Sequence, residues 1–88
     1  MTSKWKVETT DQFDQEFKKL DRSVQRRVLT YLRDVEGLDD PRQRGKGLTA
    51  NHAGVWRYRV GDYRILAQLI DNTMTVLTLG VGHRRDVY

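Results

Sequence analysis

The stretch VWRYRVGDYRILAQLI, residues 55–70, decides the fold of this chain. Its two halves are apolar-rich, and between them stands Gly61-Asp62. A glycine at the first of two central positions suits a type II′ turn, the tight loop that joins neighbouring antiparallel strands. We therefore predict a hairpin of two strands, Val55–Val60 and Tyr63–Ile70.

Two more strands are predicted outside this hairpin. Asp71-Asn72-Thr73 reads as a turn, and Thr75–Val81 follows it as the last strand. Near the other end, Trp5–Glu8 alternates apolar and polar residues, as a half-buried strand does.

Helical periodicity fills the region between the first strand and residue 37. Thr9 followed by Gln12 is typical of a capping box, and Asp21 or Ser23 can cap a second helix that ends at Gly37. Apolar residues recur at helical spacing in both segments: Phe13, Phe17 and Leu20 in the first, and Val24, Val28, Tyr31, Leu32 and Val35 in the second.

Residues 39–54 lack periodicity and predict a long basic loop. The order β-α-α-β-β-β over residues 1–88 then predicts one α+β domain. Its two N-terminal helices should pack on one face of an antiparallel sheet.

Composition excludes several classes of protein. The chain has 88 residues, no cysteine and two histidines, His52 and His83, that lie far apart in sequence. Disulfides and thiolate metal sites are therefore excluded, and we expect neither a metal nor a cofactor. No apolar run approaches the ~20 residues that cross a bilayer, and no signal peptide pattern is visible, so we expect a cytoplasmic protein with no membrane partner.

Positive charge is concentrated in the second half of the chain. Residues 1–40 carry eight Lys and Arg against nine Asp and Glu, a net charge of −1. Residues 41–88 carry eight Lys and Arg against three Asp, a net charge of +5. Seven of these later cations are arginines, which grip phosphate through two parallel hydrogen bonds. This distribution favours a polyanionic partner, although small domains are also often basic without one.

Strand alternation predicts where those arginines point, because successive strand residues face opposite sides of a sheet. The helices should cover the face of Trp56, Tyr58, Tyr63 and Ile65. Arg57, Arg59 and Arg64 then share the opposite, open face, with Arg59 directly across from Arg64. Like charges opposite one another cost stability, which an anion bound between them would offset. The alternative is an ordinary solvated face.

The last strand is expected to follow the same rule. We predict that Leu77, Leu79 and Val81 form its core row and that Val76, Thr78, Gly80, Gly82 and Arg84 form the open row. His83 would then lie beside the leucine row, unless a bulge reverses it. His52 is expected to be a bystander in a loop.

Two motifs are set aside. Gly45-Lys46-Gly47 is no P-loop, because the upstream glycine and the Ser or Thr after the lysine are missing. The two helices do not predict a DNA-reading helix-turn-helix, since the sheet requires both of their apolar stripes.

The central hairpin resembles the most distinctive segment of RelE-type toxins of the RelE/ParE superfamily. The C-terminal string VGHRRDVY, residues 81–88, is similar to their C-terminal signature. Phe13, residues 17–20 and residues 45–48 also fit, so that the resemblance covers essentially the whole chain.

The resemblance implies the toxin of a type II toxin–antitoxin system. Such toxins are ribosome-dependent, metal-independent endoribonucleases that cut messenger RNA in the ribosomal A site. The 2′-hydroxyl attacks the adjacent phosphate, which leaves a 2′,3′-cyclic phosphate and a 5′-hydroxyl. A cognate antitoxin, the ribosome and mRNA are the implied partners.

The resemblance also implies roles for single residues. Arg57 and Arg59 stand where RelE toxins carry lysines, one of them proposed as the base. Because arginine almost never loses its proton, we assign both to phosphate binding. Arg64 would stabilise transition-state charge, Arg84 would assist the leaving oxygen, and Tyr88 would stack on the nucleotide. His83 is an alternative proton carrier, as in some relatives. RNA-backbone contacts are expected from Lys18, Lys19, Arg26 and Lys46.

Two other functions stay open from sequence. Some members of the superfamily inhibit DNA gyrase and cut no RNA. A basic RNA-binding regulator without catalytic activity is the third possibility, because no clear base is present.

Overall fold

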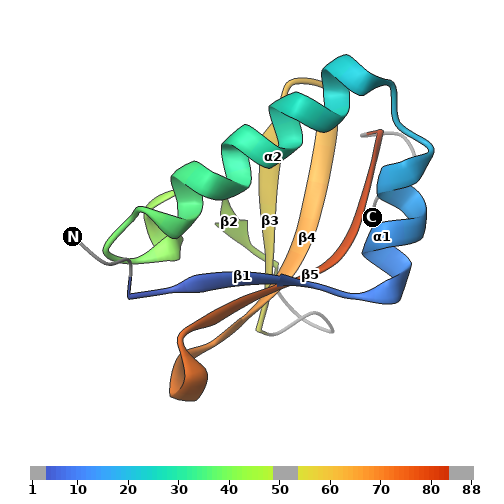
Figure 1. The fold of residues 1–88 in the computed structure, drawn as a ribbon. Coiled ribbons are helices and arrows are strands. Elements are labelled where there is room, and N and C mark those ends of the chain that lie inside the picture. The colour runs from blue at the N-terminus through green and yellow to red at the C-terminus, as the bar shows by residue number, and fades with distance from the viewer. Residues whose placement is uncertain (1–3, 49–53, 84–88) are drawn as a thin grey trace.

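The computed structural model describes residues 4–48 and 54–83, which form a single mixed sheet with two helices (Figure 1). The predicted α+β class is confirmed. In chain order the elements are β1 (Lys6–Thr9), α1 (Asp11–Lys18), α2 (Arg22–Glu36), a 3₁₀ turn (Pro41–Gln43), β2 (Lys46–Gly47), β3 (Val55–Val60), β4 (Tyr63–Ile70), a second 3₁₀ turn (Asp71–Thr73) and β5 (Thr75–His83).

The five strands follow the order β1-β5-β4-β3-β2. Two details differ from the prediction. β1 pairs with β5 in parallel, whereas the other pairs are antiparallel. The chain leaves β1 through two helices and not through a tight turn, so no local geometry imposes an antiparallel pair. In addition, the predicted basic loop contains the short strand β2, which pairs with β3.

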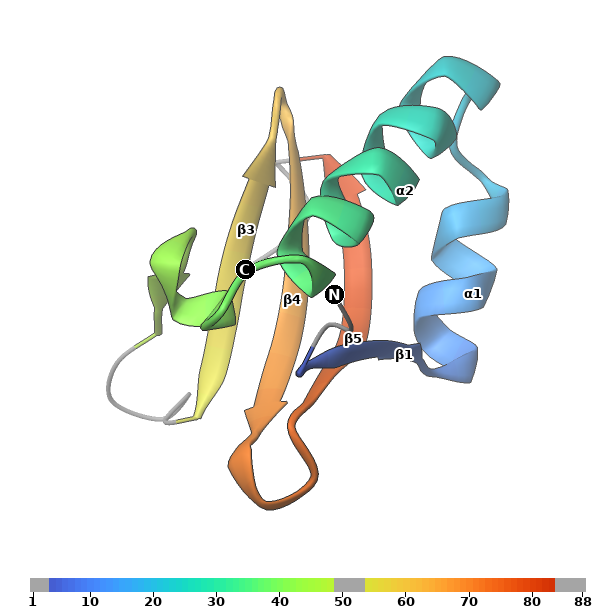
Figure 2. The same ribbon diagram turned by 60° about the vertical axis from the view of Figure 1, so that its left-hand side comes forward.

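Figure 1 shows α2 running across the sheet in front of β3 and β4, with α1 beside β5, and Figure 2 shows the same arrangement turned by 60°. The two helices and the facing side of the sheet enclose one apolar core. Its fully buried members include Val28 and Val35 of α2, Tyr58 of β3, Ile65 of β4 and Val76 of β5. Among the described residues, no helix is long and apolar enough to span a membrane.

The start of α1 corrects the predicted capping box. The N-cap is Thr10, whose side-chain oxygen accepts a hydrogen bond from the backbone N–H of Phe13 at 3.2 Å, whereas Thr9 ends β1. The same Thr10 hydroxyl donates to the carbonyl oxygen of Thr78 at 2.9 Å. Thr10 therefore caps α1 and also bonds to β5, and both contacts favour it as the N-cap. Asp21 occupies the N-cap of α2, and Gly37 is its C-cap.

The central hairpin forms as predicted. Val60 pairs with Tyr63, which leaves Gly61 and Asp62 as a two-residue loop. Gly61 has φ of +60°, a conformation that residues with a side chain rarely adopt.

The predicted core row of β5 is wrong over the first half of the strand. Val76 and Thr78 are fully buried, whereas Leu77 and Leu79 are half-buried. The register between β4 and β5 shifts at Leu66/Ala67, so that Leu79 is bulged out of the pairing. The bulge exchanges the two rows, and beyond it Val81 lies in the core as predicted. The prediction assumed strict alternation along the strand and therefore missed this one extra residue. Gly80 does not lie in the open row as predicted: it is buried, and a β-carbon there would stand 2.8 Å from the Glu16 carboxylate of α1.

Candidate nucleic-acid interface

Three arginines lie on the open face of the hairpin, as strand alternation predicted. Arg59 pairs directly with Arg64, and Arg57 pairs with Leu66 two residues further along the same face. Arg59 is exposed, and Arg57 and Arg64 are half-buried. The covered face carries Tyr58 and Ile65, neither of which has any exposed surface.

β2 brings a fourth cation to this face. Lys46 pairs with Arg57, and in an antiparallel pair opposite residues point to the same side. The next pair, Gly47 with Trp56, lies on the covered side: a β-carbon at Gly47 would stand 3.0 Å from the indole ring. Lys46 therefore joins Arg57, Arg59 and Arg64, and these four residues are called the cation cluster below.

The guanidinium groups of Arg59 and Arg64 converge on one acceptor. Arg59 Nε donates to the carbonyl oxygen of Gly61 at 3.4 Å, and one terminal nitrogen of Arg64 donates to the same oxygen at 3.2 Å. Arg27 of α2 also reaches the turn: a β-carbon at Gly61 would clash with its guanidinium. A backbone carbonyl carries only partial negative charge, so it leaves the arginine charges unneutralised.

The salt bridges in the described part of the chain lie outside the cation cluster. The salt bridges there join Lys6 with Glu8, Arg42 with Asp40 and Asp71, and Arg44 with Asp34. None of them includes a member of the cation cluster. Four cations that share one surface and form no salt bridge with the described residues give it a positive potential, which attracts polyanions.

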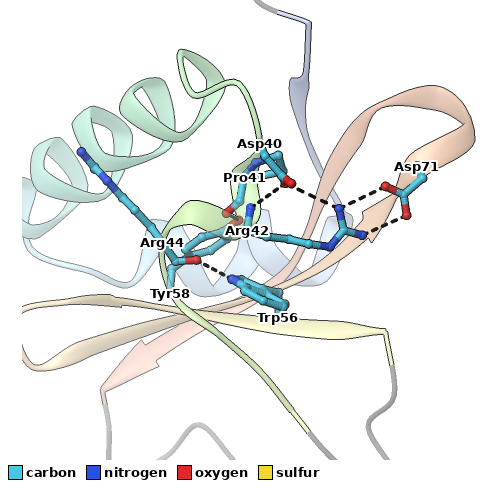
Figure 3. A network of polar contacts seen from close by, with 7 residues as sticks. All are labelled: Asp40, Pro41, Arg42, Arg44, Trp56, Tyr58 and Asp71. Carbon is cyan, nitrogen blue, oxygen red and sulfur yellow. Dashed lines mark hydrogen bonds and ion pairs between the residues drawn. The ribbon is translucent and has the colours of Figure 1, made fainter.

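A network of polar contacts fastens the segment before β2 to the sheet (Figure 3). Arg42 makes a bidentate pair with Asp71 at 2.9 and 3.1 Å, which ties this segment to the turn before β5. The hydroxyl of Tyr58 donates to the carbonyl oxygen of Pro41 at 2.8 Å in the protein interior. Burial raises the pKa of Tyr58 well above its ordinary value.

Trp56 contacts the residue that lies two positions before β2. Its indole Nε1 donates to the carbonyl oxygen of Arg44 at 2.6 Å. Gly45 then has φ of +76°, and a β-carbon there would lie 2.7 Å from the same indole nitrogen. Sequence reasoning missed this network, although the Gly45-Lys46-Gly47 spacing was a signal that the backbone passes close to a bulky side chain.

His83 lies away from the cation cluster. It pairs with Tyr63 on the helix-covered side, and the two rings meet edge to face with centroids 5.5 Å apart. With Glu16, Lys19 and Leu20 these rings line a cavity of about 350 Å³ between α1 and the end of β5. His83 therefore lies on the side of the sheet that strand alternation predicted.

The remaining predicted site residues fall into two groups. Arg84 and Tyr88 lie outside the described residues, as does His52, which was expected to be a bystander. Lys18 and Arg26 are exposed on the helices and Lys19 is exposed at the C-cap of α1. All three therefore lie on the helix side of the sheet, away from the cation cluster. Over residues 4–48 and 54–83, no group of three or more His, Cys, Asp or Glu is arranged to hold a metal ion.

Comparison with known proteins places this chain in a family. The family model described as the ParE toxin of the type II toxin–antitoxin system parDE matches residues 7–88. Toxin RelG of Mycobacterium tuberculosis is 41% identical over 49 residues, a match that spans 56% of this chain and 56% of RelG.

Solved structures agree with the family match. The RelBE2 toxin–antitoxin complex of M. tuberculosis contains a chain with 30% identity and a TM-score of 0.83, covering 91% of this chain and 98% of that one. The archaeal RelE–RelB complex of Pyrococcus horikoshii has the same fold, with a TM-score of 0.74 at 21% identity over 96% of this chain and 99% of that one. The chain therefore belongs to the ParE toxin family of type II toxin–antitoxin systems, within which it is a RelE-type toxin. The resemblance seen in the sequence is confirmed.

Proposed function

We propose that this toxin is a metal-independent endoribonuclease that cuts messenger RNA in the ribosomal A site. The observation that carries the proposal is the open face, where Arg57, Arg59 and Arg64 gather without a carboxylate partner among the described residues. A toxin that acted only through apolar contacts would gain nothing from this arrangement, which costs folding stability.

The proposed chemistry matches what guanidinium groups do well. Attack of the 2′-hydroxyl on phosphorus places negative charge on the non-bridging oxygens of the transition state. Arg59 and Arg64 already direct donors at one oxygen, that of Gly61, and a phosphate oxygen is a stronger acceptor than a carbonyl. Arg57, two residues before Arg59 in β3, extends the same row.

Roles outside the described residues rest on the family resemblance. We assign Arg84 to the departing 5′-oxygen and Tyr88 to stacking on the target nucleotide. Lys18, Lys19 and Arg26 are proposed contacts to ribosomal RNA backbone. His83 receives no role in this proposal, because it packs on Tyr63 behind the sheet.

A cognate antitoxin is the proposed protein partner. RelE-type relatives were solved in complexes with RelB antitoxins, both in M. tuberculosis and in P. horikoshii. A nuclease of translated mRNA also needs such control if the host is to survive. Expression of this chain alone should arrest growth, and co-expression with its antitoxin should restore it.

Primer extension in a reconstituted translation system tests the activity. The wild-type chain should give codon-phased cuts within the reading frame. Arg64→Ala should reduce the cleavage rate about 100-fold or more, the usual loss for one donor to transition-state charge. Arg33→Ala removes the same charge from the exposed side of α2 and serves as the control.

Each other outcome identifies a different function. Because the matching family model is that of ParE, the same preparations are tested on DNA gyrase. Gyrase inhibition without RNA cuts would replace the nuclease with a gyrase toxin. RNA binding without cuts or gyrase inhibition would leave a regulator.

A further inference from the structure

Cleavage by 2′-hydroxyl attack requires a group that accepts the hydroxyl proton. The three arginines of the open face do not fit this task, since a guanidinium stays protonated in proteins. His83 lies on the covered side of the sheet. Within the cation cluster, one residue ends in a group that exchanges its proton more readily than arginine, and it is Lys46.

The register of β2 places this amine next to the phosphate-binding row. Lys46 is exposed and stands opposite Arg57 on the open face. Its chain neighbour Gly47 lies against the indole of Trp56 on the other side, which fixes the alternation of β2. The amine therefore projects from the edge of the sheet toward the side where a phosphodiester held by Arg57 would lie.

β2 is held in this register by more than its two residue pairs. The Trp56 indole holds the Arg44 carbonyl, Gly45 turns the chain with φ of +76°, and the N–H of Leu48 donates to the carbonyl oxygen of Val55 at 2.9 Å. The contacts of Arg42 and Tyr58 in Figure 3 anchor the preceding turn. Such anchoring at both ends suits a residue that must meet a reacting atom and not merely a diffuse charge.

We propose that Lys46 is the proton acceptor of the reaction, which rests on the proposed ribonuclease function. The neutral amine takes the 2′-hydroxyl proton while the 2′-oxygen bonds to phosphorus and the bond from phosphorus to the 5′-oxygen breaks. The departing oxygen takes a proton from water. The hydroxide so formed removes the proton from the Lys46 ammonium, which restores the amine.

The decisive variant is Lys46→Arg, which keeps the positive charge but removes the amine. Single-turnover cleavage is measured on ribosomes programmed with a defined A-site codon, with toxin concentration varied. We expect the maximal rate to fall about 100-fold or more while the half-saturating concentration changes only a few-fold. A maximal rate equal to that of the wild type would overturn the proposal, because charge alone would then suffice.

A charge-matched exchange controls for the position of the amine. Lys46→Arg combined with Arg57→Lys keeps every charge and moves the amine to the paired residue across the strands. Recovery of at least a tenth of the wild-type rate supports an amine as the acceptor. If the double variant stayed inactive while Lys46→Met was active, the proposal would be refuted.

A substrate with sulfur in place of the 5′-bridging oxygen separates the acceptor from a proton donor. Sulfur leaves without needing a proton, so a defect in proton donation disappears on this substrate, whereas a defect in proton acceptance persists. Lys46→Arg should stay slow on it, and restored cleavage would make Lys46 the donor instead. If the wild-type chain cuts no RNA, the ribonuclease proposal fails first, and that result is distinct from every outcome above.

Discussion

The two faces of the central hairpin have opposite physical requirements, although their residues alternate along the same two strands. On the covered face, Tyr58 and Ile65 are completely buried against α2 and its neighbours. On the open face, Arg59 and Arg64 stand opposite each other and share one carbonyl oxygen. One face stabilises the fold, and the other places like charges where they repel.

This difference indicates that stability and activity can be altered separately by substitutions one residue apart. A buried apolar residue contributes through area removed from water and through close packing. A surface arginine contributes little to stability unless it has a partner. The predictions below test this separation, beginning with the largest expected effect.

Adjacent residues of β4 provide the first test. Ile65→Ala should lower the free energy of unfolding by about 2–5 kcal/mol, because it leaves a cavity in a fully buried site. Arg64→Ala should change it by about 1 kcal/mol or less, as expected for a residue without an ion pair. Urea unfolding at neutral pH measures both. Equal losses would show that the two faces do not differ in the way described.

The buried hydroxyl of Tyr58 gives an intermediate effect. Tyr58→Phe leaves the carbonyl oxygen of Pro41 without its donor and should cost about 1–3 kcal/mol. The conservative exchange retains the ring and its packing against Tyr31, whose centroid lies 5.8 Å away. Urea unfolding at neutral pH checks the magnitude.

The same variant should also change the alkaline stability. Burial raises the pKa of Tyr58, so the unfolded chain loses this proton first, near pH 10. The stability from Tyr58 is therefore complete below about pH 10 and declines as the pH rises further. Burial also raises the pKa of Tyr31, so part of this decline should remain in Tyr58→Phe. If the free energy of unfolding of Tyr58→Phe fell as steeply above about pH 10 as that of the wild type, Tyr58 would not be a source of the decline.

The smallest effect is expected from relief of repulsion. Arg59→Thr removes one of two directly opposed arginines and introduces a residue that favours strands. Stability should rise by about 0.2–1 kcal/mol, and the gain should shrink in high salt. Arg59→Lys keeps the charge and is the matched control. A loss of stability with Thr at both salt concentrations would show that the opposed arginines do not repel appreciably.

Sequence reasoning succeeded where the signal was local. The Gly61-Asp62 turn fixed the register of β3 and β4, and from that register the common face of Arg57, Arg59 and Arg64 followed. It failed in β5, because the bulge at Leu79 depends on packing against β4 and α1 and leaves no trace in a pattern of alternating residues. The cap at Thr10 was misplaced by one residue for a similar reason, since its hydroxyl also bonds to β5.

The sequence by itself determined the two helices, the hairpin and the excess of arginine in the second half of the chain. These follow from periodicity and turn chemistry, which act over a few residues. Only the tertiary structure decided that β1 runs parallel to β5 and that Lys46 stands beside Arg57. Both are pairings between segments distant in sequence, and they depend on which edges of the sheet remain free once the core has packed.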